Sequence, residues 1–423
     1  MGTIGALIGL ALAIFLIIKK IPPAYSMIAG ALIGGLVGGL AMTETVSVMI
    51  DGVKGVVPAI VRILAAGVLS GVLIVSGAAN TISNAIIRGL GERFALAGIA
   101  LTTMLLCGVG VFVDVAVITV APIALAVGRR LNVGIPLLLL MMIGGGKCGN
   151  IISPNPNTII AAENFSADLS LTMLYNVVPA IIGLLFVVVV IPRIVPTKFR
   201  KAEAEPAASE TATEADNAEA NLPPLWSSLV APIVTILLLA LRPIFDIQID
   251  PLIALPVGGL VGLLAMGKLN ITLRSVEQGL KSMTGVAVLL VGTGTIAGII
   301  NHCGLDTLII AGLDKMDFSP IFIAPIAGML MSAATASTTA GATVASASFC
   351  DEVIAAGVSP AWGAAMTNAG ATILDHLPHG SFFHATGGVC GLSFRRRLAL
   401  IPFESLVGLV LAAMSTLACY FFA

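Results

Sequence analysis

Apolar runs of about 20 residues follow one another along almost the whole chain, and they decide its fold class. Hydrophobic residues make up 58% of the sequence and charged residues only 10%, whereas soluble domains carry roughly 25% charge. A chain of this composition cannot form an ordinary soluble surface. Because backbone groups in lipid must be hydrogen-bonded within the protein, the sequence predicts an all-α polytopic membrane protein.

The same composition argues against several other classes of protein. The formal net charge is -1, and the basic residues lie in short clusters between apolar runs, so we expect no nucleic-acid binding. The six cysteines lie singly, without a CxxC pair or metal-ligand spacing. We therefore expect no metal and no cofactor. No spacing of a nucleophile and a base indicates an enzyme.

The apolar runs predict about ten membrane crossings together with re-entrant hairpins. The first run, Thr3 to Ile18, is followed rather than preceded by Lys19 and Lys20, so we expect a retained span whose amino end lies outside. Several later runs are too short to cross alone. All of the later runs together fall roughly at 22–42, 54–80, 94–107, 112–128, 134–146, 171–195, 225–242, 251–266, 283–302, 318–332, 342–349, 360–374 and 398–423.

One stretch, 197–224, reads as a solvated linker between two halves, 1–196 and 225–423. It is rich in Ala, Glu, Thr and Pro and has no apolar periodicity, so it cannot bury enough surface to fold. The basic sequence KFRK at 198–201 adjoins the end of a span. The positive-inside rule therefore predicts a cytoplasmic linker.

The two halves resemble each other, and their flanking charges run in opposite order. IGGLVGGLAM at 33–42 matches VGGLVGLLAM at 257–266. Basic residues precede and acidic residues follow the first copy, whereas the order is reversed around the second, so the copies are predicted to cross in opposite directions. Such an inverted-topology repeat is typical of secondary transporters with a site near the bilayer midplane. The flanking residues are Lys19, Lys20, Glu44, Asp51, Asp246, Asp250, Lys268, Arg274 and Lys281.

Glycines in the next apolar run of each half also match. After a slip of three positions, Gly52, Gly71 and Gly77 align with Gly279, Gly298 and Gly304. These matches extend the predicted repeat.

Two polar segments, 149–159 and 370–384, break the apolar sequence at matching places in the halves. Pro154 and Pro156 interrupt the first, and Pro378 with Gly380 the second. Proline removes a backbone hydrogen bond, so each segment is predicted to form half-helices or a hairpin with a polar tip. Free N–H groups at half-helix amino ends attract anions, which points to a carboxylate as the bound solute.

The first tip offers neutral hydrogen-bonding groups that either contact the substrate or satisfy the local backbone. They are Asn150, Ser153, Asn155, Asn157 and Thr158. Lys147 lies just before them and is also predicted to bind substrate, because a lysine in an apolar setting costs about 2.5–3.5 kcal/mol. The alternatives are that it reaches the interface or pairs with Glu163.

The second tip carries the titratable residues Asp375, His376 and His379. Histidine changes charge near physiological pH, so this cluster is a candidate for the coupling proton. The alternative is a structural network or an interfacial loop. The spacing HxxH resembles a metal pair, but it lacks a clear third ligand.

Two further groups belong to the candidate site. Asp114 is an acid within an apolar run, so it must face a cavity or a partner, either as a coupling residue or as a structural pair with Arg62. In the other half, Thr335, Ser337, Thr338 and Thr339 either bond substrate hydroxyls or allow close helix packing.

Four motifs together resemble a known family. VFVDVAVITVAP, SPNPNTIIAAENF, SAATASTTAGATVAS and NAGATILDHLPHGSFF, in this order, are similar to the gluconate permease family of proton symporters in the ion transporter superfamily. The resemblance implies a bacterial inner-membrane carrier of small sugar acids or other hydroxy acids, driven by a proton gradient. It also implies a homodimer embedded in membrane lipid.

By the same resemblance, Asp114 takes the place of an acidic residue in the family's early motif, and His376 that of its late histidine. The proline-rich tip departs from the family, with Ser153 and Asn155 in place of Pro and His, and His379 in place of an acid. The competing interpretations are a cation/proton antiporter, in which Asp114 and Asp375 bind Na⁺, and a Na⁺-coupled carboxylate transporter of the same superfamily.

Overall fold

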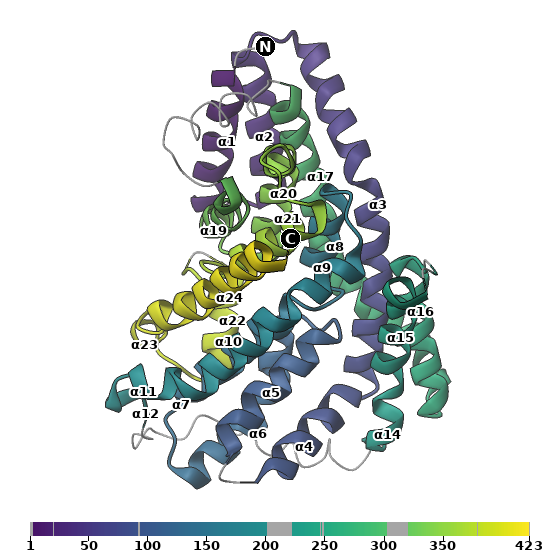
Figure 1. Cartoon of the computed structure of the whole chain (residues 1–423), viewed down its shortest axis with the longest axis vertical. Helices are drawn as coiled ribbons and strands as arrows, with labels where there is room; N and C mark the ends of the chain where they lie inside the picture. The colour runs from purple at the N-terminus through teal and green to yellow at the C-terminus, as the bar shows by residue number, and fades with distance from the viewer. Residues whose placement is uncertain are drawn as a thin grey trace.

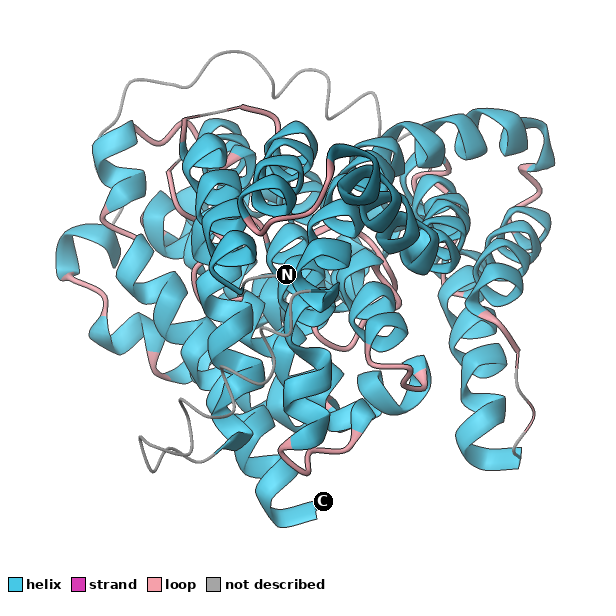
Figure 2. Ribbon diagram, turned by 90° about the horizontal axis from the view of Figure 1, so that it is seen from above, coloured by secondary structure: helices cyan, strands magenta, loops and turns pink. Residues whose placement is uncertain are grey.

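A computed structural model describes residues 3–19, 21–91, 94–200, 222–245, 247, 249–302, 320–378 and 380–422. Within these ranges the regular elements are helices and none is a strand, which confirms the predicted all-α class (Figure 2). The helices are α1 (Thr3–Ile18), α2 (Pro23–Val37), α3 (Met42–Val75), α4 (Ala78–Leu90), α5 (Ala95–Gly108), α6 (Val113–Leu131), α7 (Ile135–Asn150), α8 (Pro156–Asn164), α9 (Leu169–Tyr175), α10 (Val177–Val189), α11 (Ile191–Ile194), α12 (Thr197–Arg200), α14 (Leu225–Ser228), α15 (Val230–Phe245), α16 (Pro251–Ala265), η2 (Leu269–Ile271), α17 (Thr272–His302), η3 (Pro320–Phe322), α19 (Ile323–Thr335), α20 (Thr338–Ala355), α21 (Pro360–Ala371), α22 (Ser381–Val389), α23 (Phe394–Leu398) and α24 (Ile401–Phe422).

The two longest helices start earlier than the apolar runs predicted. α3 begins at Met42 rather than at 54, and α17 begins at Thr272 rather than at 283. Both extensions carry charged residues, which hid the helix from a reading based on hydropathy. α3 also ends at Val75 rather than at 80, because Gly77 adopts a left-handed φ of 80° that breaks the helix.

α3 and α17 pack along each other at glycine contacts that bring their backbones together (Figure 1). A Cβ on Gly52 would lie 2.1 Å from the carbonyl oxygen of Gly294, and one on Gly71 would lie 2.0 Å from that of Ser275. Small residues at such crossings allow van der Waals and backbone contacts that lipid cannot replace. α2 packs on α17, and α16 packs on α3. The helices of one half thus cover the long helix of the other.

The remaining helices form a group around the two polar segments. α5 packs against α7, and α19 packs against α21. The chain is irregular after α7 and after α21, as predicted for broken helices, and resumes in α8 and α22. α8 then packs against α20 and α21, whereas α22 packs against α6. Each broken helix therefore crosses to the other half of the chain.

The predicted linker falls mostly on residues 201–221, which lie outside the described residues. Its first four residues differ from the prediction, because Thr197–Arg200 form the short helix α12 and Phe199 is buried. Four helical stretches in the described part are long and apolar enough to cross a membrane: Met42–Val75, Leu169–Ile194, Leu269–Ile299 and Phe394–Phe422. The predicted total of about ten crossings stays a prediction.

The glycine contacts between α3 and α17 give a first prediction. We expect Gly52→Ala to lower stability by about 1–3 kcal/mol, because the added methyl group forces the two backbones apart. The measurement is the thermal unfolding midpoint of the purified protein in detergent. The control is Gly55→Ala in the same helix, where a Cβ would meet nothing within 4 Å. Equal midpoints for the two variants would contradict the close contact.

Candidate functional site

The breaks in the helices meet at one cavity of about 1040 Å³, which has a polar side and an apolar side. Its polar side is formed by four chain segments: Phe112–Val115, the pair Asn150 and Asn157, Thr335–Ala340, and the group Asp375, Gly380 and Phe382. Two of these segments are the broken helices predicted from the sequence. The other two are the turns that join α5 to α6 and α19 to α20. They fall largely in gaps between predicted apolar runs, but the sequence did not identify them as polar tips.

Four helices begin at this cavity, because residues of their first turns line it. α6 begins at Val113, α8 at Pro156, α20 at Thr338 and α22 at Ser381. The first N–H groups of a helix have no partner within the helix, and the helix dipole adds partial positive charge. Four such ends favour a negatively charged solute.

The first tip is held mainly by bonds within itself. The Asn155 side chain accepts a hydrogen bond from Thr158 N at 3.1 Å and donates one to Asn150 O at 2.9 Å. Ser153, Asn155 and Thr158 are buried, and they are not among the residues that line the cavity. Asn150 and Asn157 do line it. The structure therefore separates the five predicted residues into Asn150 and Asn157, which face the cavity, Asn155 and Thr158, which support the turn, and Ser153, whose buried hydroxyl has no hydrogen-bond partner among the described residues.

The turn between α19 and α20 brings hydroxyl groups to the same cavity. Thr335, Ser337, Thr338 and Thr339 line it, as the sequence suggested. Ala336 between them has a left-handed φ of 47°, a conformation that costs energy for a residue with a side chain. Ser337 caps α20 by accepting from Ala340 N at 3.3 Å.

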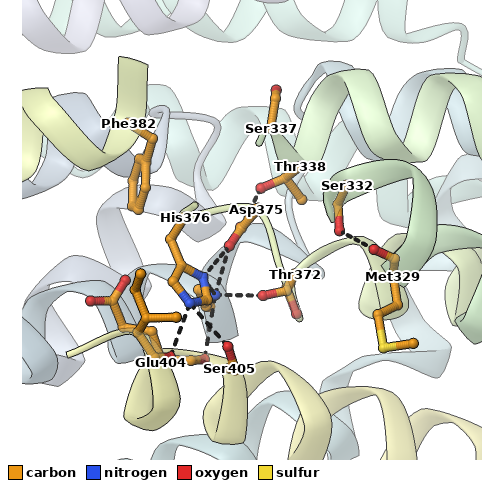
Figure 3. A network of polar contacts seen from close by, with 12 residues as sticks. Met329, Ser332, Ser337, Thr338, Thr372, Asp375, His376, Phe382, Glu404 and Ser405 are labelled. Atoms are coloured by element: carbon orange, nitrogen blue, oxygen red, sulfur yellow. Dashed lines mark hydrogen bonds and ion pairs between the residues drawn. The ribbon is translucent and has the colours of Figure 1, made fainter. Parts of the chain in front are cut away.

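The second tip joins both halves through charged groups (Figure 3). Asp375 Oδ2 accepts from Thr338 Oγ1 at 2.6 Å, and its Oδ1 lies 2.7 Å from Lys147 Nζ and 2.9 Å from His376 Nδ1. Lys147 is fully buried. Both alternatives for Lys147, reaching the interface and pairing with Glu163, are therefore wrong. The predicted pair of Asp375 and His376 is present.

The partners of His376 indicate its tautomer. Its Nε2 lies 3.1 Å from the carbonyl oxygen of Ile401, which can only accept, so we assign the proton to Nε2. Nδ1 then accepts from Lys147 Nζ at 3.0 Å. If His376 takes a second proton at Nδ1, that nitrogen becomes a donor to Asp375 and Lys147 loses an acceptor. The charge state of His376 is thus linked to the lysine contact.

A second buried ion pair, Arg397 with Glu404, lies beside this network and was not found in the sequence. Both side chains are 1% exposed, and Arg397 Nη2 also donates to Thr386 at 3.2 Å. The guanidinium lies 4.8 Å from the centre of the Phe383 ring. The signal was the run FRRR at 394–397 just before the last apolar stretch, which our predictions from the sequence did not use.

Asp114 lines the cavity, as an acid in an apolar run requires. Its Oδ1 accepts from Val115 N at 2.9 Å. The alternative pairing with Arg62 is wrong, because Arg62 binds Glu163 and, at 2.8 Å, Asp250. Among the described residues, Asp114 has no ion-pair partner. His379 lies outside the described residues.

A many-helix membrane protein whose helix breaks meet at one cavity with polar groups on one side has the architecture expected of a transmembrane transporter. The sequence comparison gives the family: the model of the GntP family permeases matches residues 1–422. The chain therefore belongs to this family of transporters and is not an enzyme. The resemblance to gluconate permeases is confirmed.

Relatives cover most of the chain. A Haemophilus influenzae protein described as an uncharacterized transporter is 52% identical, over 98% of this chain and 97% of that protein. A gluconate permease of Pseudomonas aeruginosa is 26% identical over 86% and 85%. The D-serine transporter DsdX of Escherichia coli is 22% identical over 79% of each chain.

A solved structure shares the fold. The crystal structure of the Alcanivorax borkumensis YdaH transporter, described as having an unusual topology, superposes with a TM-score of 0.64 at 15% identity. It covers 89% of this chain and 87% of that one. The family and this fold together make the chain a multi-pass membrane protein.

The contacts of Asn155 give a second prediction. We expect Asn155→Ala to lower stability by about 1 kcal/mol, because α8 loses the side chain that caps its first turn. Asn155→Ser should recover most of this loss, since serine is also a good capping residue. The measurement is the thermal unfolding midpoint in detergent. Wild-type stability in Asn155→Ala would show that the cap contributes nothing.

Proposed function

We propose that the protein imports a small hydroxy carboxylate, such as gluconate, across the bacterial inner membrane together with a proton. The observation that carries this proposal is the meeting of four helix amino ends at one polar cavity. These ends favour a carboxylate. Membership of a permease family with relatives named gluconate permease supports the same substrate class.

The neutral groups that line the cavity suit the rest of such a substrate. Asn150, Asn157, Ser337, Thr338 and Thr339 carry hydroxyl or amide groups that donate and accept hydrogen bonds. A sugar acid presents several hydroxyl groups that need partners when they leave water, because a buried polar group without a hydrogen bond is costly. The cavity is large enough for a molecule of this size.

Proton coupling follows from the position of Asp114. An ionised Asp114 at the cavity repels a carboxylate, whereas a protonated Asp114 does not and can donate a hydrogen bond to it. Binding of the proton and binding of the anion therefore favour each other, and this linkage is reciprocal. Asp375 differs because Lys147 already lies beside it. We assign the transported proton to Asp114, with His376 as the second candidate.

The proposal includes an inverted repeat. In the predicted repeat, Gly52 matches Gly279 and Gly71 matches Gly298. Replacing each glycine by its match converts the contact of Gly52 with Gly298 into a contact of Gly279 with Gly71, and this second contact is also present. This exchange is the expected behaviour of two helices related by a twofold axis in the membrane plane. The glycine contacts therefore support the repeat. We also propose a homodimer, by analogy with the superfamily alone.

The test is uptake of labelled gluconate, with D-serine and simple carboxylates as competitors, by proteoliposomes. We expect accumulation when the outside is acidic and no dependence on Na⁺. Accumulation that requires Na⁺ instead would favour the Na⁺-coupled alternative. No uptake or competition by any carboxylate would refute the substrate class.

Asp114 gives a third prediction. We expect Asp114→Asn to abolish accumulation driven by a pH gradient, because the amide cannot exchange a proton. Exchange of labelled for unlabelled substrate should persist, since it moves no net proton. The control is Asp51→Asn at an exposed ion pair with Lys54. Normal uphill uptake by Asp114→Asn would transfer the coupling role to His376.

Asn157 gives a fourth prediction. It lines the cavity and donates to Asn368 Oδ1 at 2.7 Å. We expect Asn157→Ala to weaken substrate binding by roughly 1–3 kcal/mol, because a polar group of the bound substrate loses its partner. Isothermal titration with the substrate identified by uptake measures the change. Unaltered affinity would limit Asn157 to a structural role.

A further inference from the structure

The ammonium group of Lys147 lies among ligands that are mostly oxygen atoms. It donates to the carbonyl oxygen of Thr372 and to Asp375 Oδ1, and lies 3.4 Å from the carbonyl oxygen of Glu404. The fourth neighbour is His376 Nδ1 at 3.0 Å. Two main-chain carbonyl groups and a carboxylate thus surround one positive charge that is buried inside the protein.

The site is located where a helix end favours a cation. Thr372 is the residue that caps the carboxyl end of α21, and the dipole of a helix places partial negative charge at that end. In transporters with broken helices, carbonyl groups at such ends coordinate Na⁺. We propose that the Lys147 ammonium is a tethered cation in a site otherwise suited to Na⁺, so that transport needs no sodium. This inference deepens the proposed function, on which it rests.

The close approach of α24 completes the site. Gly408 lies against the end of α21, and a Cβ there would stand 2.5 Å from the carbonyl oxygen of Thr372. Only glycine allows this approach without displacing that carbonyl. The first turn of α24 also supplies the carbonyl of Glu404, and the Glu404 side chain is fixed by Arg397. The oxygen atoms are therefore held in place by a rigid part of the molecule.

A matching residue in the other half shows what the lysine adds. Lys147 lies two residues before Gly149, and Asn368 lies two residues before Gly370. Lys147 reaches across to the second tip, whereas Asn368 reaches across to the first, where it bonds Asn157 and Thr158. The first tip carries no acid and is joined by a neutral residue. The positive charge of Lys147 therefore balances the negative charge of the Asp375 carboxylate in the second tip.

This assignment changes the role predicted for Lys147. It is not among the residues that line the cavity, and its donors are used by the protein. Removing the ammonium would leave the Asp375 carboxylate buried without a counter-charge, which is strongly unfavourable. A free cation of suitable size should then occupy the vacated position. Lys147 is thus a positioning residue that replaces a soluble coupling ion.

The experiment compares thermal unfolding of Lys147→Ala and wild-type protein in detergent, without substrate. Sodium chloride and ethylammonium chloride are compared with choline chloride at equal ionic strength. We expect Na⁺ or ethylammonium to raise the midpoint of Lys147→Ala by roughly 2–4 °C, because a bound cation stabilises the folded state. We expect no effect on wild-type protein or on Lys54→Ala, which removes an exposed lysine.

Two results would overturn the inference. One is a folded Lys147→Ala protein that neither cation stabilises relative to choline. The other is wild-type protein stabilised by Na⁺, since its site should be filled. The double variant Lys147→Ala/Asp375→Asn should lose the cation effect, and a persistent effect would also contradict the assignment.

The wild-type arm can still refute the inference if Lys147→Ala does not fold, because stabilisation of the wild type by Na⁺ would show that the site is not filled by the lysine. Because no substrate is present, this assay is independent of gluconate uptake. Failure of uptake would refute the proposed function and leave the cation result intact, whereas Na⁺ binding by the wild type would refute only the tethered cation.

Discussion

The hydrogen bonds of the backbone are the constraint on which this structure depends. In a lipid environment an unpaired N–H or C=O group costs several kcal/mol, so a chain can leave the helix only where protein or a water-filled cavity surrounds it. Here four of the breaks between helices do not lie at scattered places. Residues of the segments between α5 and α6, α19 and α20, and α21 and α22 border the same cavity, and so do Asn150 and Asn157 on either side of the break between α7 and α8. The cost of breaking four helices is thus concentrated at the place where polar backbone groups serve binding.

Buried charged side chains are likewise paired and gathered near the helix breaks. Lys147 pairs with Asp375, and Arg397 pairs with Glu404, each within the group of helices around the tips. Such pairs are a weak source of stability, because desolvation consumes most of the Coulomb energy. Their effect is positional. The first pair fixes α7 of one half against the second tip of the other, and the second pair fixes α23 against α24 beside it. The tips are held by these bonds, whereas Asp114 stays available at the cavity.

Local sequence was sufficient to locate the two broken helices, because proline coincides there with a run of polar residues. Proline alone would not have been enough, since Pro58 lies inside α3 and Pro256 lies inside α16. The turns at Val109–Phe112 and Ala336–Ser337 fell largely in the gaps between predicted apolar runs, but nothing in the sequence identified them as helix breaks at the site. These are built from Val, Gly, Phe, Ala and Ser, which occur equally well inside membrane helices. Partners far apart in the chain were also beyond reach. Arg62 was a plausible partner of Asp114 and Glu163 of Lys147, yet Arg62 and Glu163 bind each other. Only the packing of α3 against α8 decides that choice.

The walls of the cavity differ in a way that bears on transport. The tips provide its polar side, whereas the residues after α1 and those of α17 provide a largely apolar side, with Ile21, Pro22, Val286, Val288 and Leu289. The apolar side belongs to the helices that pack around α3 and α17. In the proposed function, a hydrophilic substrate would form its hydrogen bonds mainly with one group of helices and be covered by the other. Separation of the two groups would open the cavity without breaking a bond between the tips and the substrate. The ion contact of Arg62 on α3 with Glu163 on α8 joins the same two groups on the surface, whereas its contact with Asp250 before α16 lies within the group around α3. These side chains are about one quarter to one third exposed, so water can replace their contacts at little cost.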